Sequence, residues 1–137
     1  MAANTSPIFT RLGDIQWTTL ASSNTAKDGT GTVATAFTAD ATNGGFVDQI
    51  RLQAAGSNTQ TVMRFFANNG STNATATNNS FVGEIGLPAT TLSETVPVHG
   101  EIVIPVGVAF PAGYKLNCTI STAVSAGWAI TVIGGKY

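Results

Sequence analysis

The feature that most limits how this chain can fold is a series of short runs in which apolar and polar side chains alternate. The clearest run covers residues 46–53, where one face of an extended chain carries Phe46, Asp48, Ile50 and Leu52. Alternation with a period of two is typical of a half-buried β-strand. Apolar spacing of the helical kind is not sustained over three turns anywhere in the sequence. We therefore predict an all-β protein.

About eight such runs follow one another, separated by turns rich in Gly, Asn, Asp and Ser. We place the strands at residues 17–20, 31–39, 46–53, 59–67, 81–87, 96–104, 116–121 and 128–133. This number of short strands is typical of a two-sheet sandwich of the jelly-roll or Greek-key type. We predict one sandwich domain over residues 17–137, preceded by an amino-terminal arm, residues 1–16, that packs on the domain or on a neighbouring subunit.

Four of these segments, and the loop 68–79, carry more specific expectations. Segment 59–67 has bulky side chains on both faces, so it is either a central strand covered on both sides or a strand that meets a partner. Segment 96–104 contains Pro97 and precedes Pro105, which indicates a sheet edge or a bulge. We expect 116–121 and 128–133 to form a terminal hairpin, and 68–79 to be a long exposed loop.

Composition excludes several classes of partner. Only 9% of the 137 residues are charged, against roughly 25% in typical soluble domains. The chain has six Lys and Arg residues and seven Asp and Glu residues, and neither kind is clustered. We therefore expect neither nucleic acid nor a membrane surface as a partner. We also expect no signal peptide and no membrane-spanning segment. Low net charge gives little repulsion between copies and therefore favours self-association.

No constellation of catalytic or metal-binding residues is recognisable, so we predict no enzyme, no catalytic residue, no metal site and no cofactor. His99 is the single histidine, and an exposed pair with the nearby Glu101 favours a structural role. The carboxylates stand singly along the chain, at Asp14, Asp28, Asp40, Asp48, Glu84, Glu94 and Glu101. Two arrangements stay open at this point: a glycosidase pair built from distant carboxylates, and calcium held by loop carbonyls and one Asp.

Individual side chains carry further predictions. Asp48 interrupts an apolar face, and Arg51 and Arg64 lie on two adjacent predicted strands, which indicates that Asp48 takes part in a structural ion pair. The only cysteine, Cys118, is expected to be a small buried hydrophobic residue. Several aromatic side chains are expected in the core, with a sugar-stacking platform as the alternative: Phe37, Phe46, Phe65, Phe81 and Trp128.

Four turn and strand-end motifs resemble one known group of proteins. They are Gly44-Gly45-Phe46-Val47-Asp48-Gln49-Ile50-Arg51, Phe66-Ala67-Asn68-Asn69-Gly70, Glu84-Ile85-Gly86-Leu87-Pro88-Ala89-Thr90-Thr91 and Phe110-Pro111-Ala112-Gly113-Tyr114. In these motifs, and over roughly the last two-thirds of its length, the chain resembles small virion proteins of tailed bacteriophages, the capsid decoration, head auxiliary or cement proteins.

The resemblance implies a jelly-roll-like β-sandwich that binds the outer surface of a phage head, with the major capsid protein as its partner and a homotrimer as its assembly. It also implies synthesis in the cytoplasm of the host bacterium and a final location on the capsid surface. The alternative is a phage fibre or spike domain, or a carbohydrate-binding β-sandwich module. In that alternative loop 68–79 and exposed aromatic residues such as Trp17 or Tyr114 would contact sugars.

Overall fold

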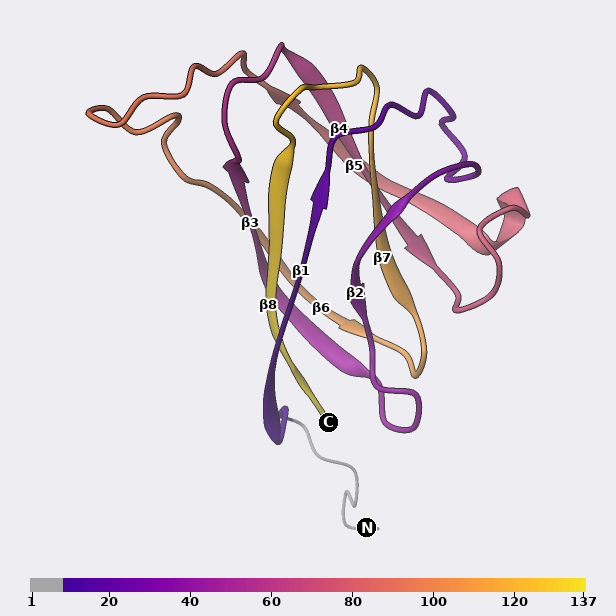
Figure 1. The fold of residues 1–137 in the computed structure, drawn as a ribbon. Helices are drawn as coiled ribbons and strands as arrows, with labels where there is room; N and C mark the ends of the chain where they lie inside the picture. The colour runs from indigo at the N-terminus through magenta and orange to yellow at the C-terminus, as the bar shows by residue number, and fades with distance from the viewer. Residues whose placement is uncertain (1–8) are drawn as a thin grey trace, which may run out of the picture.

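The computed structural model of this protein describes residues 9–137, which form eight β-strands and one short 3₁₀ helix, η1 (Ala76–Asn78) (Figure 1). Sheet A has the order β1 (Leu12–Leu20), β8 (Trp128–Lys136), β3 (Gly45–Ala54) and β6 (Ile102–Phe110). Sheet B has the order β2 (Ala34–Thr38), β7 (Lys115–Ile120), β4 (Thr61–Asn68) and β5 (Asn79–Leu87). All named pairs are antiparallel, which confirms the all-β, two-sheet prediction.

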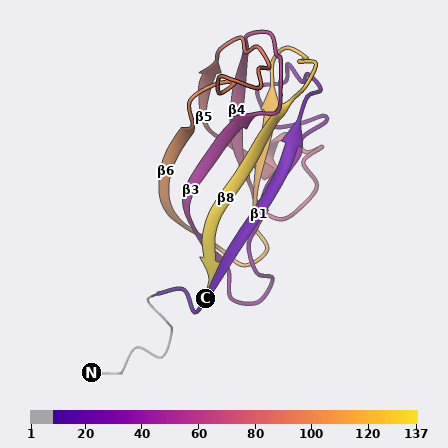
Figure 2. The same cartoon turned by 60° about the vertical axis from the view of Figure 1, so that its left-hand side comes forward.

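The pairing of strands is nested along the chain. The first strand pairs with the eighth, the second with the seventh, the third with the sixth and the fourth with the fifth. This strand order is that of a jelly roll, in which two Greek keys place alternate pairs in opposite sheets. Figure 2 shows sheet A with β1, β8, β3 and β6 side by side in that order.

The core lies between the two sheets and is built from their inward-facing side chains. Sheet A contributes Leu52, Trp128, Ile130 and Val132, all of them fully buried. Sheet B contributes further buried side chains, which are Phe37, Met63, Phe65, Leu116, Cys118 and Ile120. Each large apolar side chain that leaves water contributes about 1.5–3 kcal/mol, so this layer is the main source of stability in a chain with no disulfide.

The predicted terminal hairpin is wrong. β7 lies in sheet B and β8 in sheet A, so the segment between them carries the chain across the sandwich. The alternating pattern correctly indicated that one face of each strand is buried, since Cys118 and Ile130 are both fully buried. Alternation does not specify which strand supplies the hydrogen bonds, and a short turn between two strands of this kind suits a crossover as well as a hairpin.

A β-bulge in β3 changes the predicted faces of the clearest strand. The register shifts between Val47 and Gln49, so Val47 points into the core together with Ile50 and Leu52. Phe46 is half-buried, and Asp48 is exposed at the bulge. The predicted buried carboxylate at Asp48 is therefore wrong, because an extra residue in one strand turns the side chains before it to the opposite face.

The predicted boundary of the amino-terminal arm is also wrong in part. β1 begins at Leu12 and pairs with β8 along its whole length, so residues 12–16 belong to sheet A. The pattern was missed because Ile15 and Trp17 are exposed, whereas the inward positions carry the polar Asp14 and Gln16. Residues 1–8 lie outside the described part of the chain.

Two expectations about single strands are confirmed. β4 is a central strand between β5 and β7, with Met63 fully buried in the core and Phe66 fully buried beside Phe81. β6 is an edge strand with a register shift opposite its partner β3, although it covers residues 102–110 rather than 96–104. The first alternative for segment 59–67, coverage on both faces, is therefore the observed one.

The polar loop 68–79 is largely exposed, as predicted, but it is also tied to a second loop. The side-chain amide of Asn73 donates to the carbonyl oxygens of Gly29 and Gly31, at 3.2 and 2.7 Å. The amide of Asn79 donates to the carbonyl of Asp28 at 3.1 Å. Asn side chains, and not buried apolar side chains, hold this loop in place, because their amides donate to backbone carbonyls that have no partner in a neighbouring strand.

Candidate binding surfaces

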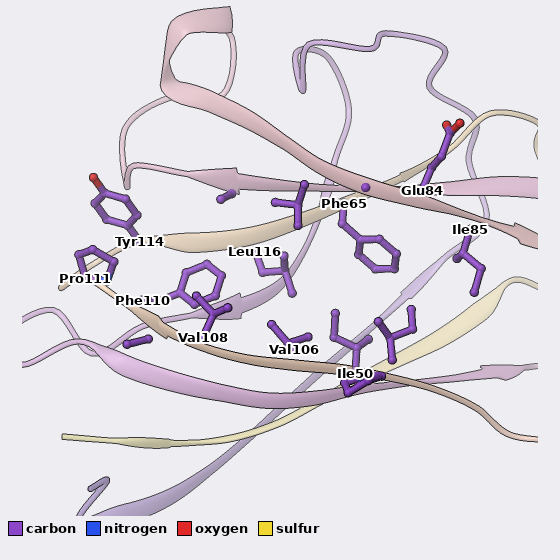
Figure 3. Close-up of a pocket in the computed structure, with 16 residues that line it drawn as sticks. Ile50, Phe65, Glu84, Ile85, Val106, Val108, Phe110, Pro111, Tyr114 and Leu116 are labelled. Atoms are coloured by element: carbon purple, nitrogen blue, oxygen red, sulfur yellow. The ribbon is translucent and has the colours of Figure 1, made fainter. Parts of the chain in front are cut away.

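One flank of the sandwich is open. β5 ends sheet B and β6 ends sheet A on the same side, and an apolar cavity of about 540 Å³ lies between these two edges. We call it the β5–β6 groove. Figure 3 shows Val106, Val108 and Phe110 of β6 facing Phe65 and Leu116 of sheet B across it. A cavity of this size lies within the range that small ligands or inserted side chains fill.

A missing side chain on β5 contributes to this opening, and β6 carries a glycine at its bulge. A Cβ added at Gly83 of β5 or at Gly107 of β6 would meet no atom within 4 Å. Gly83 lies opposite Phe65 in the β4–β5 ladder, so it leaves one side of that ring uncovered by β5. Gly107 has a φ of +63°, a backbone conformation that favours glycine, and it lies within the bulged part of the β3–β6 pair. It alternates with Val106 and Val108, which line the groove, so it shapes the backbone of β6 and is not itself part of the groove lining.

The opposite flank is closed by a single side chain. Gln16 of β1 donates from Nε2 to the carbonyl of Thr38 at 2.9 Å and accepts from the Thr38 N–H at 2.8 Å. This amide joins the edge of sheet A to the edge of sheet B, as a backbone segment would. The polar inward face of β1 therefore has a structural explanation, and the core is less accessible here than at the β5–β6 groove.

The groove is apolar to its rim. Glu84 is the one charged residue among those that line it, and its carboxylate points away from the cavity in Figure 3. Glu84 Oε2 accepts from Arg64 Nε at 3.1 Å on the other face of sheet B. Tyr114 lies at one end of the groove with its hydroxyl directed outward. The groove therefore favours an apolar occupant over a charged one.

The two edges of the groove differ in their capacity to add a further strand. β6 contains Pro105, which has no N–H, and is distorted by its register shift and by Gly107. Proline and bulges protect a sheet edge from pairing with other chains. β5 has no proline between Asn79 and Leu87. We infer that contacts at β6 are made through side chains, and that β5 is the edge that can also offer backbone groups.

A second apolar surface lies at the opposite edge of sheet A. Four large apolar side chains at and before β1 are exposed, namely Phe9, Leu12, Ile15 and Trp17. We call them the β1 row. Ile15 and Trp17 share the outer face of sheet A, whereas Leu12 alternates to the other face of the strand. Trp17 is 74% exposed and Phe9 is 82% exposed. Single exposed apolar residues are common on proteins, but several that follow one another on one edge strand are typical of an interaction surface.

The residues considered for catalysis are not brought together. His99 is half-buried in the loop before β6, where Nδ1 lies 2.5 Å from the carbonyl of Gly100 and the ring packs edge-on to Trp128. Glu101 instead accepts from Arg51 Nη1 at 2.6 Å. Within residues 9–137, no three His, Cys, Asp or Glu side chains lie close enough to hold a metal ion.

The ion pairs differ from the predicted one. Arg51 and Arg64 each pair with a glutamate, Glu101 and Glu84, rather than with Asp48. The Arg51 and Glu101 side chains are about half exposed, which limits the contribution of this pair to about 1 kcal/mol or less. These pairs join side chains on the outside of the sandwich and do not form a reactive site.

Two predictions about aromatic side chains need correction. Phe81 is 51% exposed rather than buried, because it lies on the edge strand β5 and contacts Phe66 from outside the core. Tyr114 is half-buried at the end of the groove and not freely exposed. Trp17 remains the aromatic side chain with the geometry of a stacking platform, since it stands on the outer face of sheet A opposite Thr131.

Cys118 has the buried position that the sequence predicted. Its side chain is fully buried in the core, and burial raises the pKa of the thiol far above its ordinary value. We expect iodoacetamide to leave Cys118 unmodified in the folded protein at neutral pH and to modify it fully in concentrated urea. Mass spectrometry after timed labelling checks this. Rapid labelling of the folded protein would show that the core opens locally.

Asp40 organises the end of the sandwich where β2, β3 and β7 meet. Its backbone carbonyl accepts from the N–H groups of Gly44 and Gly113, at 3.0 and 3.1 Å. Its carboxylate accepts from the N–H groups of Asn43 and Thr42, at 2.9 and 3.0 Å. The hydrogen bonds from Asn43 and Thr42 lower the pKa of Asp40 below its ordinary value of 3.8.

This arrangement predicts a pH-dependent contribution to stability. Because the pKa of Asp40 is lower in the folded protein than in the unfolded chain, its ionised form stabilises the fold above the unfolded pKa, and this contribution is lost as the pH falls through the folded pKa. We expect Asp40→Asn to be less stable than the wild type at pH 7 and equally stable in strong acid. Urea unfolding at both pH values measures the difference. A difference that does not change with pH would contradict the prediction.

No family model, curated protein or solved structure matches the chain. In the described part of the chain no helix is long and apolar enough to cross a membrane.

Proposed function

We propose that this chain is a structural, non-enzymatic virion protein, a capsid decoration or cement protein that binds the outer surface of a phage head as an oligomer. The observation that carries the proposal is the pairing of two exposed apolar surfaces, the β5–β6 groove and the β1 row, on one small jelly roll. Surfaces of this kind suit a protein whose role is to bind other proteins. The proposed partner is the major capsid protein, and the proposed assembly is a homotrimer.

The motifs that resemble phage decoration proteins lie at defined places in the fold. Gly44 packs against the backbone of Phe110 and Ala112, and Gly70 packs against the backbone of Gly113. Three of the four motifs thus meet at one end of the sandwich, around the Asp40 turn. They fix the turns of a jelly roll, and this supports the proposal through architecture and not through a reactive site.

Weak charge suits assembly on a large surface. The formal net charge is −1, so neighbouring copies on a head would repel one another little. Attachment of an oligomer through several equivalent contacts strengthens binding without any strong single contact. We propose synthesis in the cytoplasm of the host bacterium, followed by addition to the assembled capsid.

Co-sedimentation with phage heads tests the proposal. Heads assembled from the proposed partner, the major capsid protein of the same genome, are mixed with the purified chain and separated on a sucrose gradient. We expect saturable binding and a higher unfolding temperature of the decorated heads. Absence of the chain from the head fractions at saturating concentration would overturn the capsid proposal.

Trp17 favours a second candidate function, that of a fibre, spike or carbohydrate-binding module. Its indole is 74% exposed, and Thr131 and Arg51 occupy neighbouring register positions on β8 and β3. An exposed aromatic face beside polar side chains is suited to stacking on a sugar ring.

A glycan array separates the two functions. Specific binding that disappears in Trp17→Ala but not in Phe81→Ala would support the carbohydrate candidate, because Phe81 is an exposed aromatic residue on the other sheet. A glycan array without specific signals would contradict the carbohydrate-binding candidate.

A further inference from the structure

We propose that copies of this chain associate head to tail, with the β1 row of one copy seated in the β5–β6 groove of the next. The proposal rests on the oligomeric part of the proposed function and specifies its interface. The occupant of the groove is then a second copy of this chain. All residues that carry it lie within the described part of the chain.

The groove requires an occupant with apolar side chains on an extended backbone. It lies between two edge strands, and its walls are mainly the aliphatic and aromatic side chains of β3, β4, β5, β6 and β7. Val108 is 49% exposed and Val82 is 60% exposed, so its rim is open to water in the isolated chain. Covering such side chains contributes about 25 cal/mol per Å² of apolar surface removed from water.

The β1 row has these properties. It lies on and just before a strand of nine residues, and its members Leu12, Ile15 and Trp17 are more than half exposed. β1 hydrogen-bonds to β8 on one side only, so the strand forms the margin of sheet A. Because no strand of sheet A flanks β1 on its other side, the outer-face side chains Ile15 and Trp17 can enter a groove on another molecule.

The positions of the two surfaces determine the symmetry of the contact. β1 and β6 are the opposite edges of sheet A, so the row and the groove lie on opposite flanks of one molecule (Figure 2). A copy cannot fill its own groove with its own row. Contact between two different surfaces is heterologous, and it closes into a ring when the rotation between copies permits. A trimer is the ring expected from the proposed function.

Charges beside the two surfaces agree with this arrangement. Arg11 is exposed between Phe9 and Leu12 of the row, and the Glu84 side chain is 53% exposed beside the groove. Glu84 uses Oε2 for Arg64 and has a second carboxylate oxygen. Opposite charges at the rim of an interface favour the correct orientation, whereas the almost neutral chain offers no general repulsion between copies.

Substitutions on each surface test the proposal by sedimentation velocity. We expect the wild type to sediment as an oligomer at high micromolar concentration, and Trp17→Asp in the row and Val108→Asp in the groove to sediment as monomers. Val82→Asp provides a second groove variant at an even more exposed position. Leu92→Asp is the matched control, because Leu92 is 57% exposed in the loop after β5 and belongs to neither surface. Circular dichroism and thermal unfolding verify that each variant is folded.

Mixing the variants distinguishes head-to-tail contact from a symmetric one. Trp17→Asp retains an intact groove, and Val108→Asp retains an intact row. An equimolar mixture of the two is therefore expected to form a dimer that grows no further, although each variant alone is monomeric. A mixture that stays monomeric would overturn the heterologous contact.

Other outcomes overturn the interface without affecting the capsid proposal. A monomeric wild type, or an oligomer that survives folded Trp17→Asp and Val108→Asp variants, would show that these surfaces do not join copies. If a monomeric wild type still co-sediments with phage heads, the interface fails and the proposed function stands. If the oligomer forms as described but does not bind heads, the interface stands and the capsid proposal fails.

Discussion

Replacing Gly134 by alanine is expected to destabilise the sandwich by about 3 kcal/mol or more, with a fall in the unfolding temperature of roughly 10 °C. Gly134 lies in β8 opposite Val47, at the bulge of β3. A Cβ at this position would lie 2.0 Å from the carbonyl oxygen of Phe46 and 3.2 Å from the Val47 Cα. These are backbone atoms, so relief requires β3 and β8 to separate next to the bulge.

Gly86→Ala is the control for this prediction. Gly86 is also a glycine within a strand, but an added Cβ would meet no atom within 4 Å. Its replacement removes conformational freedom from the unfolded chain without introducing contact, so we expect stability to stay within about 1 kcal/mol of the wild type. Urea unfolding of both variants gives the comparison. If Gly134→Ala unfolds at the same urea concentration as Gly86→Ala, the close approach of β3 and β8 is not as described.

The core was largely predictable because it depends on local alternation. Leu52, Cys118 and Ile130 are buried as their period-two patterns predict, and the turns fall at the Gly, Asn and Asp clusters. Alternation indicates only that one face of a strand is buried and the other is exposed to solvent. The sequence could not predict that Val47 and not Phe46 points into the core, because a bulge is fixed by the partner strands and not by the residues of β3 alone.

Long-range pairing could not be predicted for a related reason. Leu12 pairs with Lys136 at the other end of the chain, and no local pattern specifies such a partner. The polar Gln16 on the inner face of β1 is understandable only once β2 lies beside it. Local sequence therefore predicted the all-β class and the approximate number of strands, whereas the order of strands in each sheet came from the structure.

The β5–β6 groove was missed although its signals are present in the sequence. Gly83 interrupts the inward apolar face of β5, and Gly107 lies at the bulge of β6. A glycine in a strand sequence is equally compatible with a β-bulge, with the close approach of another backbone, or with an unfilled space beside the strand. Only the distances around each Cβ position separate these meanings: Gly134 faces backbone at 2.0 Å, whereas Gly83 faces open space.

Asn58→Ala is expected to cost about 3 kcal/mol, because one buried side chain joins two loops at the same end of the sandwich. Asn58 is 4% exposed. Its Oδ1 accepts from the N–H groups of Ala126 and Gly127, at 3.0 and 2.9 Å, and its Nδ2 donates to the Gly127 carbonyl at 2.8 Å. Alanine would leave both N–H groups without this acceptor. Thermal and urea unfolding measure the loss.

Two further substitutions separate burial from hydrogen bonding at this position. Asn69→Ala removes similar side-chain bonds, to Ser71 and Asn78, but Asn69 is exposed, so water replaces them and the expected loss is under about 1 kcal/mol. Asn58→Asp retains an acceptor for the two N–H groups and directs a second oxygen at the Gly127 carbonyl.

The two N–H groups would lower the folded-state pKa of the introduced carboxyl group. We expect burial and repulsion from the Gly127 carbonyl to outweigh them and to raise this pKa above its unfolded value. The penalty of Asn58→Asp relative to the wild type is therefore expected to be small below the unfolded pKa, where the protonated acid can donate to Gly127, and to grow as the pH rises through the unfolded value toward the folded one. This is the reverse of the trend expected at Asp40, whose hydrogen bonds stabilise the ionised form. A penalty independent of pH would show that burial and the Gly127 carbonyl do not outweigh the two N–H groups.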